Sequence, residues 1–228
     1  MSKRKISRGT CVFCKNAYSK SGMSRHLGAC KARKAATAAQ EAGGTAATRL
    51  FHLVVQGTYA PELWLHLDVP ASATLRDVDQ FLREIWLECC GHLSMFRIQG
   101  RNFMDQVLDD WWGMDDRDMN VMLGRVLTPG LKFSHEYDFG STTYLTLKVV
   151  SEREGAPSQD EPVQLLARNE LPDLRCDLCG KPAVYVDVFD DYTLLCEECD
   201  ETDGYGEGQM PVVNSPRMGV CGYIGGVR

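Results

Sequence analysis

Two sets of potential metal ligands stand near the two ends of the chain. They consist of Cys11, Cys14, His26 and Cys30 in the first set and of Cys176, Cys179, Cys196 and Cys199 in the second. Each set opens with two cysteines separated by two residues, which aims two thiolates at one point, and a second pair closes the tetrahedron. Because four protein ligands leave no coordination position for a substrate, the spacing predicts two structural zinc ions.

A short helix is predicted to carry the second half of the first set. It begins at Ser21 or Gly22 and runs to about residue 34, which places positions 23, 26, 27 and 30 on one face. Met23 and Leu27 therefore lie beside the two helical ligands and can cover the metal. So small a unit depends on the metal for its stability. The segment resembles CCHC-type zinc fingers of the knuckle-then-helix kind, and we predict such a finger at residues 1–34.

Charge is distributed unevenly along the chain. Residues 1–34 contain ten Lys or Arg and no Asp or Glu, while the other residues hold 15 basic and 31 acidic side chains, a net charge of −16. The basic segment predicts a contact with the phosphates of DNA or RNA. The candidate contact residues are Lys15, Lys20, Arg25, Lys31, Arg33 and Lys34. The alternative is a finger that docks onto protein and binds no nucleic acid.

Changes in composition divide the rest of the chain. Residues 35–48 are rich in Ala, Gly and Thr, which predicts a flexible linker and a finger that moves independently of the body. Residues 49–152 have the apolar pattern of a packed domain. We expect a second linker at 153–170, followed by the four-cysteine module and a tail at 171–228.

The central domain alternates predicted strands with one helix. Strands are expected at 50–56, 63–69 and 92–98, and a hairpin is expected from 132–137 and 142–150. The segment 63–69 has the period of a half-buried strand. Thr74 and Asp77 have the spacing of a capping box, which begins a helix that ends near residue 88. This order predicts an α+β fold with a β-grasp-like mixed sheet and one packed helix, flanked by two small zinc-stabilised modules.

Several phrases of this domain resemble one known family. They are LWLHLDV at 63–69, GHLSMFRI at 91–98, LTPGL at 127–131 and above all KFSHEYDFG at 132–140, with the capped helix between the first two. In this order they are similar to the plasmid pRiA4b open-reading-frame-three-like family, over about residues 49–152. The resemblance implies a plasmid or another mobile element as the source, and it implies no established activity. Many members carry further polar residues after the DFG phrase, whereas this chain reads STTYL at 141–145.

No catalytic residues are predicted. His52, His66, His92 and His135 fall on separate predicted strands, where we interpret them as exposed residues or as partners of backbone groups. Their convergence on an active site is the alternative. Five acids of the next segment are interpreted as solvated loop residues rather than as magnesium ligands, namely Asp109, Asp110, Asp115, Asp116 and Asp118. Trp111 and Trp112 are interpreted as core or interface residues rather than as a ligand-stacking surface.

Three cysteines remain outside the two ligand sets. Cys89 and Cys90 follow the predicted helix end, and we interpret them as small buried residues. Cys221 is interpreted as a buried spare thiol, or alternatively as a neighbour of the four-cysteine module. The segment 211–223 around it is apolar and rich in Gly, so we expect it to pack back on the body.

The four-cysteine module resembles a zinc ribbon and is strongly acidic. Eleven acidic residues lie between positions 173 and 207, so the module is expected to repel phosphates and to face an unidentified protein partner. No apolar run approaches the roughly 20 residues that span a bilayer, and the reduced cysteine pattern and missing secretory signal predict a cytoplasmic protein. The whole sequence predicts a zinc-binding accessory or adaptor protein of mobile-element type. The alternatives are an enzyme centred on the central domain and an interaction module without nucleic-acid binding.

Overall fold

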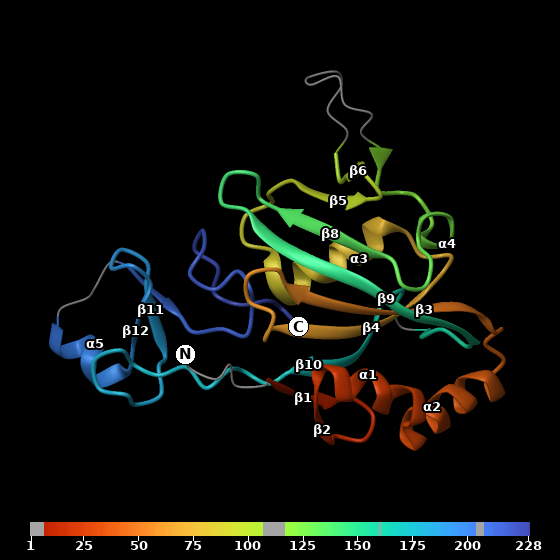
Figure 1. Ribbon diagram of the computed structural model, residues 1–228, viewed down its shortest axis with the longest axis horizontal. Helices are drawn as coiled ribbons and strands as arrows, with labels where there is room; N and C mark the ends of the chain where they lie inside the picture. Colours follow the sequence, from red (N-terminus) through yellow and green to blue (C-terminus); the bar gives the residue numbers. More distant parts are fainter. Residues whose placement is uncertain (1–6, 107–116, 160, 204–207) are drawn as a thin grey trace.

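The computed structural model describes residues 7–106, 117–159, 161–203 and 208–228, without the side chains of residues 201–203. It is a mixed α+β structure in which a large sheet packs against one amphipathic helix, and a small second sheet lies at one end of the molecule (Figure 1). The predicted α+β class, with its packed helix, is confirmed. Within the described part of the chain, no helix combines the length and the apolar character needed to cross a membrane.

Ten strands form the large sheet, in the order β2-β1-β10-β4-β3-β9-β8-β5-β6-β7. All neighbours are antiparallel except β6 and β7, which run parallel. The strands are Ala17–Ser19 (β2), Arg8–Cys11 (β1), Gln164–Asn169 (β10), Trp64–Pro70 (β4), Thr48–Gly57 (β3), Thr143–Gly155 (β9), Lys132–Tyr137 (β8), Ser94–Ile98 (β5), Arg101–Met104 (β6) and Arg117–Asp118 (β7). Every strand predicted for the central domain is present, and β9 is longer than expected.

Helix α3 (Leu75–Leu82) covers one face of this sheet. The Thr74 hydroxyl accepts a hydrogen bond from the Asp77 amide at 3.2 Å, and the Asp77 carboxylate accepts one from the Thr74 amide at 2.7 Å, so the predicted capping box is present. The predicted helix does not continue as a regular α-helix, because it widens into a π-helical turn, η1 (Arg83–Leu87). The main core lies between these helices and the sheet, and the short helix α4 (Leu123–Val126) adds one buried leucine to it.

Around β4, the opposite face of the sheet is covered by an N-terminal unit, residues 7–42, whose strands β1 and β2 continue the sheet. The residues of β4 from Trp64 to Val69 are all buried, although their alternation predicts a half-buried strand. The reason is a second core, in which Trp64 packs with Met23, Leu27 and cysteines of the first ligand set. The N-terminal unit therefore covers the face of β4 that carries its polar side chains.

Backbone hydrogen bonds attach the N-terminal unit to the sheet, which differs from the independent finger predicted. Strand β1 pairs with β10 and places Gly9 opposite Asn169. Gly9 fits here because a Cβ atom would lie 2.4 Å from the ring of Trp64. The structure also has regular elements where the sequence predicts linkers. Helix α2 (Lys31–Ala42) crosses the expected boundary at residue 34 and fills most of the linker at 35–48, and β10 lies inside the linker expected at 153–170.

The C-terminal module, residues 174–211, has a three-stranded sheet of its own in the order β12-β11-β13. Its elements are β11 (Tyr185–Asp187), β12 (Thr193–Leu195), α5 (Glu197–Asp203) and β13 (Gln209–Pro211). The C-terminal tail, residues 212–228, packs back on the body as expected. Tyr223 is buried against Val186 and Met210, and the Ser215 hydroxyl donates to the carbonyl of Trp86 at 2.6 Å.

Candidate metal centres

The first predicted ligand set converges in space. One ligand atom from each of the four residues lies within 4.8 Å of all the others, and Cys14 Sγ is 3.3 Å from His26 Nε2. Helix α1 (Lys20–Ala29) supplies the histidine and is capped by the hydroxyl of Ser19. Cys30 adopts an extended conformation between α1 and α2, so the predicted single helix is broken at a ligand. The ring of Tyr18 stacks on His26, with 4.2 Å between their centroids, and fixes the imidazole.

The second predicted set also converges, with its four ligand atoms within 4.8 Å of one another. The first pair lies in the turn before β11, and the second pair lies at the start of α5, so the three-stranded sheet carries the cluster. Cys179 Sγ and Cys196 Sγ are 3.5 Å apart. Asp177 fixes the turn, because its amide donates to the Leu194 carbonyl and its carboxylate accepts from the Leu194 amide, both at 2.8 Å.

The two cysteine turns have the same backbone hydrogen bonds. In the first, the Cys11 amide donates to the carbonyl of Asn16 and the Lys15 amide donates to the carbonyl of Cys11. In the second, the Cys176 amide donates to the carbonyl of Lys181 and the Gly180 amide donates to the carbonyl of Cys176. The residue after the second cysteine has a left-handed conformation in both turns, at φ 60° for Lys15 and 75° for Gly180. Only the second turn has the glycine that this conformation favours.

The predicted nucleic-acid contacts separate into two groups. Lys15, Arg25, Lys31 and Lys34 are exposed on the N-terminal unit. Arg33 is a structural residue instead, because its guanidinium is buried, lies 2.9 Å from the Asp68 carboxylate and donates to the Leu27 carbonyl. Lys20 is half-buried and donates to Gln56 and to the carbonyl of Pro61.

The four histidines of the central domain do not converge on one place. His52 Nε2 lies 2.8 Å from His66 Nδ1 in the interior beneath the N-terminal unit. Burial and then the charge of Arg33 lower the pKa of His52 to about 4, and burial and then His52 lower the pKa of His66 to about 3. His135 is fully buried on β8, and His92 lies at the surface before β5. Of the two interpretations of these histidines, exposure on a strand is therefore wrong for His52, His66 and His135.

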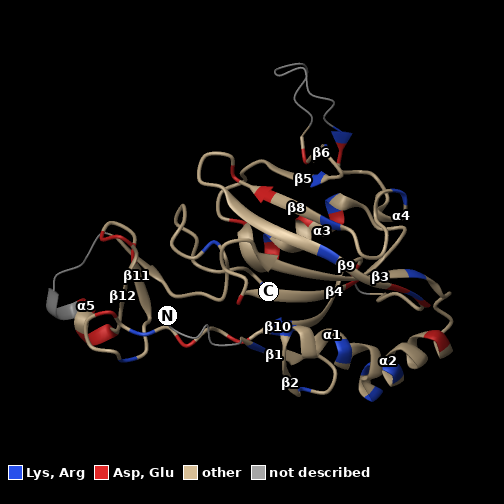
Figure 2. Ribbon diagram, viewed as in Figure 1, with Lys and Arg blue, Asp and Glu red and all other residues tan. Residues whose placement is uncertain are grey.

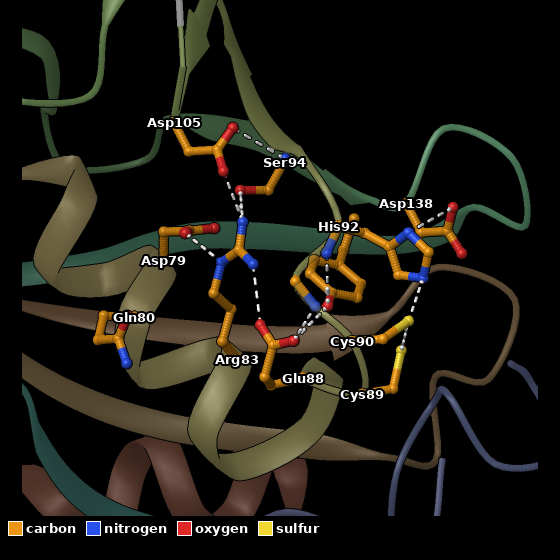
Figure 3. A network of polar contacts seen from close by, with 12 residues as sticks. Asp79, Gln80, Arg83, Glu88, Cys89, Cys90, His92, Ser94, Asp105 and Asp138 are labelled. Carbon is orange, nitrogen blue, oxygen red and sulfur yellow. Dashed lines mark hydrogen bonds and ion pairs between the residues drawn. The ribbon is translucent and has the colours of Figure 1, made fainter. Parts of the chain in front are cut away.

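A buried polar network joins α3 and η1 to the sheet (Figure 3). Arg83 forms ion pairs with Asp79 at 2.7 Å, Asp105 at 2.7 Å and Glu88 at 2.9 Å. Asp79 also lies 2.7 Å from His135 Nε2. Burial by itself raises the pKa of Asp79, but the hydrogen bond and charge of His135, together with Arg83, lower it to about 2. Asp79 is therefore held as an anion inside the protein.

A third cluster of potential ligands is formed by Cys89, Cys90, His92 and Cys221, whose ligand atoms also lie within 4.8 Å of one another. Cys90 and Cys221 are exposed, so their interpretation as buried thiols is wrong. Sequence reasoning missed this cluster because Cys221 is remote in the chain. The close spacing of Cys89, Cys90 and His92 was the available signal. The acids and the two tryptophans at 109–116 lie outside the described residues.

Comparisons with known proteins place the chain among its relatives. The model of the plasmid pRiA4b ORF-3-like proteins matches residues 50–193, more than half of the 228 residues and further than the predicted stretch at 49–152. A crystallised protein of unknown function from Methanosarcina mazei has 16% sequence identity and a TM-score of 0.46, over 53% of this chain and 69% of that one. No curated protein matches the chain. From the extent of the family match, the chain belongs to the plasmid pRiA4b ORF-3-like family.

Proposed function

We propose that this protein is a zinc-stabilised adaptor whose N-terminal unit binds the backbone of a nucleic acid. The two predicted ligand sets would each hold one structural zinc ion, through three thiolates and an imidazole or through four thiolates. Tetrahedral zinc with Zn–S distances of about 2.3 Å separates its ligand atoms by about 3.5–3.8 Å. The spacings of 3.3 Å for Cys14–His26 and 3.5 Å for Cys179–Cys196 suit such an ion.

The observation that carries the nucleic-acid proposal is the exposed charge of the N-terminal unit. Lys15, Arg25, Lys31 and Lys34 are all exposed, and α1 and α2 contain a single acid, Glu41, in the last turn of α2. Figure 2 shows Lys and Arg side by side along these helices, and acidic residues near α5. Exposed cations without neighbouring carboxylates favour phosphate binding, which carries no base specificity.

The attachment of the N-terminal unit suggests how the protein would act as an adaptor. Since β1 continues the large sheet, nucleic acid bound to α1 and α2 would be held in a fixed orientation relative to the body. The acidic module near α5 would then face an unidentified protein partner. This role fits an accessory protein of a plasmid or another mobile element, in a reducing compartment such as the cytoplasm, where thiolate ligands persist.

A salt titration of the full-length protein tests the proposal. Four phosphate contacts predict that affinity for DNA or RNA, measured by fluorescence anisotropy, falls by about 100-fold between about 50 and 200 mM salt. Replacing Arg25, Lys31 and Lys34 together by Gln should lower the slope of log affinity against log salt by about three. The zinc content should not change, because none of these residues is a ligand.

The matched control removes the same charge from another exposed part of the protein. Replacing Arg101, Arg125 and Lys132 by Gln should leave the affinity and its salt slope almost unchanged, because these exposed residues lie on the body. If the two triple variants lose affinity equally, the effect comes from the overall charge of the protein and not from the N-terminal unit. Absence of binding by the wild-type protein at low salt would instead show that the N-terminal unit only docks onto the body and onto protein partners.

A further inference from the structure

We propose that Cys89, Cys90, His92 and Cys221 form a third zinc site, which fastens the C-terminal tail to the end of η1. This inference does not depend on the nucleic-acid proposal. Its first support is the donor set, because three thiolates and one imidazole are the ligands that select zinc in structural sites. The N-terminal ligand cluster has the same composition, although there the ligands come from one short segment.

The spacing of the donor atoms suits a tetrahedral ion. Cys90 Sγ lies 3.7 Å from Cys221 Sγ and 3.5 Å from Cys89 Sγ. His92 Nε2 lies 2.9 Å from Cys90 Sγ and 3.3 Å from Cys221 Sγ. Tetrahedral zinc separates its ligand atoms by about 3.5–3.8 Å, and the two predicted clusters have separations of 3.3 and 3.5 Å. A small adjustment of His92 would complete the coordination.

The local backbone is shaped to bring these ligands together. Gly91 has φ 80°, a conformation that turns the chain so that Cys90 and His92 reach the same point. Its amide is held by the carboxylate of Glu88, which is itself fixed by Arg83. Cys221 has φ 51°, a left-handed conformation that is unfavourable for a residue with a side chain and that contacts at this site would offset.

Charged groups behind the cluster complete the site. Asp138 Oδ1 lies 3.5 Å from His92 Nδ1, the nitrogen that faces away from the cysteines (Figure 3). A carboxylate in this position orients a zinc-bound imidazole. Arg217 is fully buried and lies 2.7 Å from Asp138 Oδ2 and 3.4 Å from Cys89 Sγ. Its positive charge would offset the net negative charge of one zinc ion with three thiolates.

The distribution of the cysteines over the molecule also supports a third zinc site. All ten cysteines of the chain are free, and each belongs to one of three clusters that offer four ligands. A disulfide between two of the three thiols at the third cluster would leave one cysteine over and would give His92 no role. Coordination of one ion uses all four groups. We therefore prefer a metal to a disulfide at this position.

The site would add a further attachment to a tail that Arg217 and Val227 already hold on either side of Cys221. Between Ser215 and the chain end, the tail runs along η1, where the Val227 amide donates to the Glu84 carbonyl at 2.9 Å. Zinc would add a bond between Cys221 and the residues directly after η1. Because Cys90 and Cys221 are exposed, a chelator reaches this ion more easily than the other two.

Metal counting on the full-length protein, purified under reducing conditions, tests the proposal. Native mass spectrometry should find three zinc ions per chain, one for each cluster. Cys221→Ser should hold two, and hydrogen exchange in residues 212–228 should become at least about tenfold faster, because a tether worth 1.4 kcal/mol or more is lost. As a control, Ile224→Ser at an exposed position of the same tail should keep three zinc ions. Cys221→His should also hold three, because histidine is a zinc ligand and can replace the thiolate.

A second measurement needs no variant. Mild chelation of the wild-type protein should make Cys89, Cys90 and Cys221 the first thiols to react with an alkylating reagent. The proposal is overturned if wild-type protein holds only two ions and Cys221→Ser holds the same number. It is also overturned if Cys90 and Cys221 react equally fast with and without zinc.

Discussion

The N-terminal and C-terminal ligand clusters have matching cysteine turns but different surroundings. The N-terminal cluster is part of the second core, where Trp64 packs with Met23 and Leu27, and its strand β1 extends the large sheet. The C-terminal cluster lies on a separate three-stranded sheet. The comparison teaches that a ligand pattern specifies a local metal site, whereas the surface packed against that site decides how much of the fold depends on it.

The largest expected difference follows from removal of one ligand in each cluster. Cys14→Ser should release one zinc and uncover Trp64 and the neighbouring residues of β4, so the large sheet is destabilised. Cys179→Ser should release one zinc and unfold only the C-terminal sheet. A structural zinc contributes on the order of 10 kcal/mol, so each module should unfold locally rather than merely weaken.

Hydrogen exchange measures this difference directly. In Cys14→Ser, residues 64–70 and 164–169 should lose protection, and in Cys179→Ser the loss should be confined to the C-terminal sheet and the tail residues around Tyr223 that pack on it. Elemental analysis gives the accompanying loss of zinc. If Cys14→Ser leaves β4 and β10 fully protected, the N-terminal unit is not needed to cover the sheet, and the contrast between the two clusters fails.

A smaller effect is expected from the ion pair beneath the N-terminal unit. Arg33→Leu removes a buried guanidinium from the Asp68 carboxylate, although Arg153 remains beside the same carboxylate. Breaking a buried pair from one side typically costs about 3–5 kcal/mol, and we expect the lower end of that range in urea unfolding. Lys34→Leu, on the exposed side of the same helix, should change the unfolding free energy by less than about 0.5 kcal/mol. Similar losses in both variants would contradict the structural role of Arg33.

The smallest predicted effect concerns the left-handed residue of each cysteine turn. Gly180→Ala has open space for its Cβ but must adopt φ 75°, which costs about 1 kcal/mol and should weaken zinc binding about fivefold. Lys15→Gly should strengthen binding at the N-terminal cluster by up to a similar factor, because it relieves the same strain.

Competition with a chelator gives both zinc affinities. Lys15→Gln is the matched control, since it removes the positive charge but keeps the side chain in the left-handed conformation. It should bind zinc like the wild-type protein. If Lys15→Gln and Lys15→Gly bind equally well, the charge and not the backbone strain limits the first cluster.

The parts of the structure that depend on short stretches of chain could be predicted from the sequence. The capping box at Thr74 and Asp77 needs only residues three apart, and the strands of the central domain follow from a period of two. The grouping of the two predicted ligand sets follows from their spacing, because a two-residue interval closes a tight turn. In each case the interacting groups are close in the chain, so local geometry alone brings them together.

Only the tertiary structure decided which faces and which distant residues meet. The alternation in β4 predicts a solvent-facing side for His66, yet the N-terminal unit buries that side completely. A basic segment predicts phosphate contacts, yet the path of α2 directs Arg33 inward to Asp68. Cys221 joins Cys90 across 131 residues because the tail folds back over η1. Such pairings depend on how whole elements pack, and a local pattern in one segment contains no information about the partner that will cover it.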